Sequence, residues 1–161
     1  MIAQNLLYDI LQTIHIVSIV VWIGGMYFVH FFLRPALLAL EPPQRLALMH
    51  ATLSRFFAAV LVASLATVGS GIWMIGRTAK MVSQSGGHFM MPWTWLVMAT
   101  LGLLMLLIFF YIRFILFKPF ESSVQSSHWK DAGLHLSRIR LWVTANMLIG
   151  TAIIVIQTLF A

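Results

Sequence analysis

Residues 6–33 read LLYDILQTIHIVSIVVWIGGMYFVHFFL, with one acidic side chain, Asp9, and no lysine or arginine. About 20 apolar residues suffice to cross a bilayer, so this stretch is long enough to cross as a tilted helix. It exceeds the apolar region of a signal peptide, which has about 7–15 residues, and no basic segment precedes it. The stretch therefore predicts a first membrane-spanning helix.

The rest of the chain is also strongly apolar and carries few charges. Of its 161 residues, 61% are hydrophobic and 9% are charged, whereas about a quarter of the residues in soluble domains are charged. Further apolar runs predict spans over residues 53–75, 92–117 and 137–160. The chain is too short for a seventh or twelfth spanning helix, which excludes most large transporter architectures within one chain. We therefore expect an all-α, integral membrane four-helix bundle that forms one transmembrane domain over residues 1–161.

The positive charges indicate an orientation. Arg77 and Lys80 border the middle loop, and the other eight cations border the first and third loops: Arg34, Arg45, Arg55, Arg113, Lys118, Lys130, Arg138 and Arg140. The positive-inside rule then places those two loops in the cytoplasm and both termini on the opposite, outer side of the membrane. The net charge of +6 is thus an orientation signal, and we expect lipid rather than nucleic acid as the partner, including anionic headgroups.

His15 is the first candidate for a functional residue, because ionisable groups at membrane depth are costly. It shares one helical face with most polar and aromatic residues of its span, including Gln12, Trp22 and Met26. At 1.5 Å per residue it lies about 13 Å from the outer end. That depth is level with residues 67–70 of the second span. Either His15 binds a ligand or a proton, or it only hydrogen-bonds a neighbouring helix.

The chain has no cysteine, so metal chemistry is limited to histidine, methionine and oxygen ligands. Imidazole and thioether groups suit copper, and thioethers select Cu(I). Such residues occur at the outer mouth of the third span, on the inner half of the first span, and at His15 itself. They predict a copper path through His15, Met26, His30, His88, Met90 and Met91. The alternative is that the methionines only fill apolar core.

Haem b is the second candidate cofactor, because helical bundles hold it between facing side chains. His15 with Met98 is one predicted ligand set. His30 with His50 is another, with Arg34 and Arg55 neutralising the propionates. The third possible function is that of a structural subunit in a larger membrane complex. The sequence contains no recognisable catalytic set, so we assign no catalytic residue and leave enzymatic activity open.

A family resemblance adds to this picture. Residues 15–35, HIVSIVVWIGGMYFVHFFLRP, resemble the first helix of the copper resistance D (CopD) family of bacterial inner-membrane proteins. Further similar positions are Arg55-Phe56-Phe57, residues 70–74, and Arg138, Arg140, Asn146 and Gly150. The resemblance implies a four-helix module for copper uptake or tolerance in the bacterial inner (plasma) membrane, so that both termini lie on the periplasmic side. A periplasmic copper protein or other membrane subunits are the expected partners. The spacing of His15, Trp22 and Gly25 also resembles HemJ-type protoporphyrinogen oxidases, which bind haem b.

Overall fold

The computed structural model describes the backbone of residues 2–160 and the side chains of residues 6–160. Four helical stretches are long and apolar enough to cross a membrane: Leu6–Ala39, Pro42–Gln84, Trp93–Gln125 and Trp129–Phe160. The described residues contain no strand. The prediction of an all-α membrane protein with four spans is confirmed.

The first stretch is one nearly continuous helix that changes its winding twice. It runs through α1 (Ile2–Ile19), a π-helical segment (Val20–Gly24), α2 (Gly25–Tyr27), a second π-helical segment (Phe28–Leu33), α3 (Arg34–Ala36) and a 3₁₀ turn (Leu37–Ala39). Wider π turns shift the helical face that follows them, and they often occur at functional sites. The consecutive residues Trp22 and Ile23 are both buried within the first of them.

The other helices run well beyond the predicted spans. The second is α4 (Pro42–Gln84), the third is α5 (Trp93–Tyr111) with a π-helical segment (Ile112–Leu116) and α6 (Phe117–Gln125), and the fourth is α7 (Trp129–Phe160). At 1.5 Å per residue, α4 is about 65 Å long, twice the hydrocarbon thickness of about 30 Å. Hydropathy marks the lipid-facing part of each helix and misses these polar extensions. The polar segment between the third and fourth spans is therefore helical except for a three-residue turn, 126–128.

The turns follow from local sequence. Leu40 and Glu41 leave the helical region, and Pro42 begins α4 at the first helical position, where proline lacks only an N–H that has no intrahelical partner. Gly86 adopts a positive φ of 77° directly after α4, a conformation that glycine adopts without a steric penalty. Pro92 precedes α5 and accepts its first backbone hydrogen bonds.

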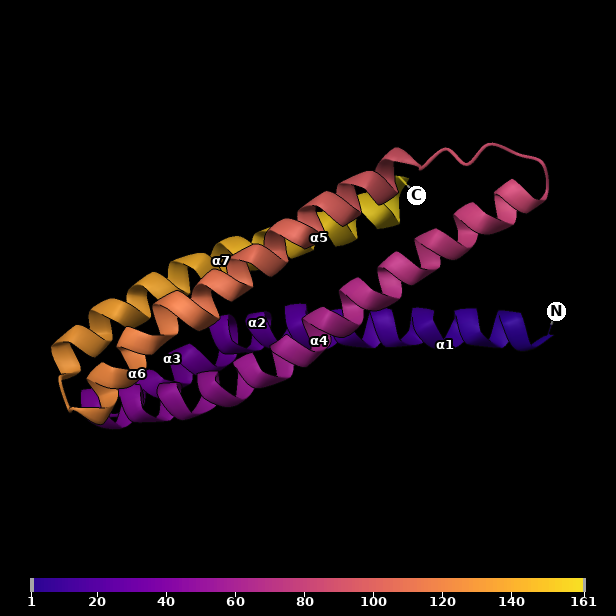
Figure 1. Cartoon of the computed structure of the whole chain (residues 1–161). Coiled ribbons are helices and arrows are strands. Elements are labelled where there is room, and N and C mark those ends of the chain that lie inside the picture. Colours follow the sequence, from indigo (N-terminus) through magenta and orange to yellow (C-terminus); the bar gives the residue numbers. More distant parts are fainter. Residues whose placement is uncertain (1, 161) are drawn as a thin grey trace.

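The four helices form two hairpins, α1 with α4 and α5 with α7 (Figure 1). The hairpins converge at the end that holds α3 and α6 and diverge toward the chain termini. Aromatic side chains fill the convergent end: the Phe57 ring centroid lies 6.2 Å from that of Phe109 and 5.3 Å from that of Phe117. All three are buried. The main core therefore lies at the convergent end of the molecule.

Candidate functional site

His15 is held against α4 by its ring nitrogen Nδ1. This atom lies 2.8 Å from the main-chain oxygen of Thr67 and 3.0 Å from the hydroxyl oxygen of Ser70. Both partners fall within residues 67–70, which the rise per residue places level with His15, so the predicted alignment of these two helices is confirmed. The side chain is half-buried. The structure thus fixes His15 between the two helices of the first hairpin.

These contacts decide which ring nitrogen carries the proton. A carbonyl oxygen only accepts, so Nδ1 donates its N–H to Thr67. The Ser70 hydroxyl donates its own proton to the carbonyl oxygen of Ala66 at 2.6 Å. Its oxygen therefore accepts the N–H of His15 Nδ1 together with the Thr67 carbonyl. In the neutral imidazole Nε2 is then the unprotonated nitrogen, and among the described residues it has no hydrogen-bond partner. Metal-binding histidines in proteins are oriented in the same manner, by an N–H to a carbonyl on the side away from the metal.

A glycine makes room for this ring. A Cβ atom placed on Gly71 would lie 3.2 Å from Cε1 of His15. Such a contact is tight, so the absence of a side chain at Gly71 allows the ring to reach Thr67. Sequence reasoning placed Thr67 and Ser70 level with His15 but did not identify these two residues or Gly71 as parts of a site, because a main-chain acceptor and a glycine leave no chemical signature in a sequence.

The inner candidates of the predicted copper path lie apart from His15. Met26 in α2 is 2% exposed and belongs to the main apolar core. His30 lies farther along the same helix, where its Nδ1 is 3.3 Å from the hydroxyl oxygen of Thr144 on α7. The two side chains therefore have separate environments, one apolar and one at the junction of the hairpins.

The outer candidates lie in the connection between α4 and α5. His88 and Met90 are exposed, the latter by 86%, and Met91 is half-buried. This segment has no helical structure, so its three side chains are close in sequence and open to solvent. Within the described residues, no group of three or more histidine, aspartate or glutamate side chains gathers in a way that would hold a metal ion.

The predicted haem ligands occupy different places. Met98 lies on α5, whereas the contacts of His15 are with α4. The His50 ring stacks on Phe117, with centroids 5.5 Å apart, and its Nε2 lies 3.4 Å from a carboxylate oxygen of Glu121. His30 faces Thr144 instead. Arg34 lines a cavity together with His30, whereas Arg55 is exposed and lies outside that lining.

The buried Asn146 on α7 is 1% exposed, and its side-chain oxygen has no hydrogen-bond partner among the described residues. Buried polar groups normally have a partner. The packing around this amide therefore leaves one acceptor unused within the protein.

Comparison with known proteins identifies the family. No curated protein and no solved structure matches the chain. The model of the family described as copper resistance protein D, CopD, matches residues 50–160, which include most of α4 and all of α5 to α7. The similarity to HemJ-type oxidases stays a prediction. Because the match covers well over half of the sequence, this chain belongs to the copper resistance protein D (CopD) family of membrane proteins.

Proposed function

We propose that this protein handles Cu(I) in the bacterial inner membrane and that Nε2 of His15 binds the ion at membrane depth. The observation that carries the proposal is the hydrogen bond from His15 to Thr67, which leaves Nε2 with a free lone pair. Imidazole nitrogen is a suitable copper ligand. The family description, copper resistance, supports copper as the ion. Copper is the cargo in this proposal, and no step changes its oxidation state.

The loop between α4 and α5 is the proposed site of first capture. His88, Met90 and Met91 offer one imidazole and two thioethers within four residues, and Met90 is 86% exposed. Soft thioether ligands favour Cu(I) over harder ions. Replacing all three residues is expected to reduce copper accumulation when external copper is scarce and to leave Cu(I) binding at His15 unchanged. The roles of Met26 and His30 stay predictions.

The direction of the chain across the membrane is part of the proposal. The charge distribution favours a periplasmic connection between α4 and α5 and a cytoplasmic turn at 126–128. Since the chain has no cysteine, single cysteines report this directly. An impermeant maleimide is expected to label Ser85→Cys in intact spheroplasts and Ser126→Cys only after lysis. The reverse pattern would invert the orientation.

The binding test uses purified protein titrated with Cu(I) against a chromogenic chelator. His15→Ala is expected to lose one equivalent of Cu(I) or at least tenfold in affinity. His128→Ala removes an exposed imidazole and serves as the matched control, with no expected change. His15→Gln retains an N–H donor for Thr67 but lacks the imidazole, so it tests binding if the alanine variant folds poorly. Unchanged stoichiometry and affinity in both His15 variants would overturn the proposal.

A further inference from the structure

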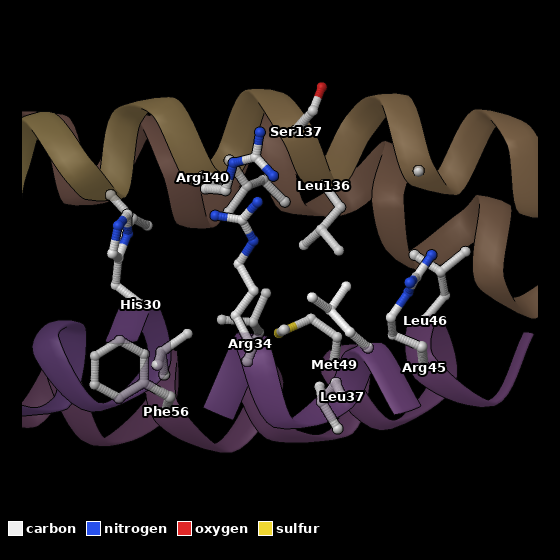
Figure 2. A pocket seen from close by; sticks show the side chains of 16 residues that line it. His30, Arg34, Leu37, Arg45, Leu46, Met49, Phe56, Leu136, Ser137 and Arg140 are labelled. Atoms are coloured by element: carbon white, nitrogen blue, oxygen red, sulfur yellow. The ribbon is translucent and has the colours of Figure 1, made fainter. Parts of the chain in front are cut away.

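A cavity of about 250 Å³ lies where the two hairpins converge, between the first helical stretch, α4 and α7. Its polar lining is basic: His30 and Arg34 come from the first stretch, Arg45 from α4, and Arg140 from α7. Figure 2 shows the side chains of Arg34 and Arg140 reaching toward each other from opposite sides of the cavity. Three separate segments of the chain thus direct cations into one space.

In the part of the chain that the structure describes, these arginines form no ion pair. The cavity lining contains no aspartate or glutamate. In the described part of the chain, the sole ion pair joins His50 and Glu121, so Arg34, Arg45 and Arg140 are without acidic partners there. The charges of Arg34 and Arg140 repel each other. Arg34 is half-buried and Arg140 is exposed, so water screens part of this repulsion, and an anion between the two groups would remove the rest.

The shape of the arginine groups favours a phosphate. Guanidinium groups bind phosphate oxygens through two parallel N–H donors, which a single ammonium group does not offer. Two such groups facing each other match the several oxygens of one phosphate. A cavity of about 250 Å³ has room for a phosphate with part of its ester groups.

The remaining lining points to a lipid rather than a free ion. Leu37, Leu46, Leu53 and Phe56 supply apolar walls, which a hydrated inorganic ion would not contact favourably. Leu38 also lines the cavity and is 67% exposed, so the cavity continues onto the outer surface of the helices. Basic pockets between membrane helices are typical binding places for anionic lipid headgroups.

We propose that this cavity binds the phosphate group of an anionic phospholipid, with Arg34 and Arg140 as the main contacts. The acyl chains would leave past Leu38 along the lipid-facing surface. Because Arg34 belongs to the first hairpin and Arg140 to the second, the bound phosphate links the two hairpins. This binding site does not include His15.

The test measures thermal unfolding of the purified protein in neutral detergent with added phosphatidylglycerol, with added phosphatidylcholine, and with inorganic phosphate. The variant R34Q/R140Q removes two charges from the cavity. The control K118Q/R138Q removes two exposed charges at the same end of the molecule, neither of which lines the cavity. Both variants change the net charge equally, so general surface attraction affects them alike.

Phosphatidylglycerol is expected to raise the melting temperature of the wild type and the control, and to bind R34Q/R140Q at least tenfold more weakly. Without lipid, R34Q/R140Q is expected to melt no lower than the wild type, because the screened repulsion between the two arginines is gone. Equal loss of lipid binding in both double variants would overturn the proposal that the lipid phosphate binds in this cavity. Equal stabilisation by inorganic phosphate alone would show a free phosphate as the ligand and overturn the assignment to lipid.

Discussion

Nδ1 of His15 lies 2.8 Å from the main-chain oxygen of Thr67 on the facing helix. A main-chain carbonyl keeps its acceptor character whatever residue occupies position 67, so the backbone of α4 sets the protonation pattern of a side chain on α1. The open nitrogen of His15 is therefore a property of the hairpin rather than of either helix alone. Changes on α4 are expected to alter copper binding without removing a ligand.

Ser70 shares the N–H of His15 with Thr67, so Ser70→Ala leaves the carbonyl as the single acceptor. We expect Cu(I) affinity to fall about tenfold, within the range of about 10–100-fold for residues that orient a metal ligand. Ser64→Ala is the matched control, because Ser64 is buried on the same helix and donates to Leu61. Competition with a chromogenic chelator measures the Cu(I) affinity of both variants. Equal affinities for Ser70→Ala and the wild type would contradict the orienting role.

Gly71 and Gly69 allow a paired test of the space beside the His15 ring. A Cβ on Gly71 would lie 3.2 Å from the ring, whereas one on Gly69 meets nothing within 4 Å. Gly71→Ala is expected to displace the ring by a few tenths of an ångström and to weaken Cu(I) binding several-fold. Gly69→Ala is expected to bind copper as the wild type does and to gain about 0.5–1 kcal/mol of helix stability. Similar copper affinities in the two variants would contradict a tight contact between the His15 ring and position 71.

The adjacent glycines Gly24 and Gly25 are expected to respond in opposite ways. A Cβ on Gly25 would overlap the Phe56 ring, whereas a Cβ on Gly24 has open space around it. Gly25→Ala is therefore expected to destabilise the protein by about 1–3 kcal/mol through overpacking. Gly24→Ala should be neutral or stabilising. Thermal unfolding in detergent compares them, and a stable Gly25→Ala protein would argue against the close approach of these helices.

Asn146→Leu is expected to raise the free energy of unfolding by about 1 kcal/mol. The replaced amide oxygen is buried without a partner, and such a group costs about 1–3 kcal/mol. For a chain of this length, the melting temperature should rise by about 2–4 °C. Gln157→Leu is the contrasting variant, because the Gln157 amide donates to the carbonyl of Thr94, and it should melt lower. A lower melting temperature for Asn146→Leu would show that the amide makes a stabilising contact.

Sequence reasoning found the features that depend on single helices. Lipid requires long apolar stretches, so the four spans followed from composition, and the rise per residue placed Thr67 and Ser70 level with His15. The level at which a side chain meets the facing helix is therefore predictable when two helices form one hairpin. The fixed rise of a helix and a short connection determine the register.

Features that depend on packing between the hairpins were not predictable. The cavity that unites Arg34, Arg45 and Arg140 forms only because the hairpins converge, and the helical extensions lack a hydropathy signal. The π-helical segments around Trp22 alter the winding without a distinctive composition. His30 and His50 seemed a pair by depth, yet the structure gives them separate partners on α7 and α6.

The central claim is that Thr67 leaves Nε2 of His15 open for Cu(I). Nitrogen-15 NMR of protein labelled at histidine tests it directly, because Cu(I) is diamagnetic and the two ring nitrogens have distinct shifts when protonated and when bare. The His15 signals are assigned by their loss in His15→Gln. We expect a protonated Nδ1 and a bare Nε2, with Cu(I) shifting the Nε2 resonance. A protonated Nε2, or His15 signals that do not respond to Cu(I), would contradict the account.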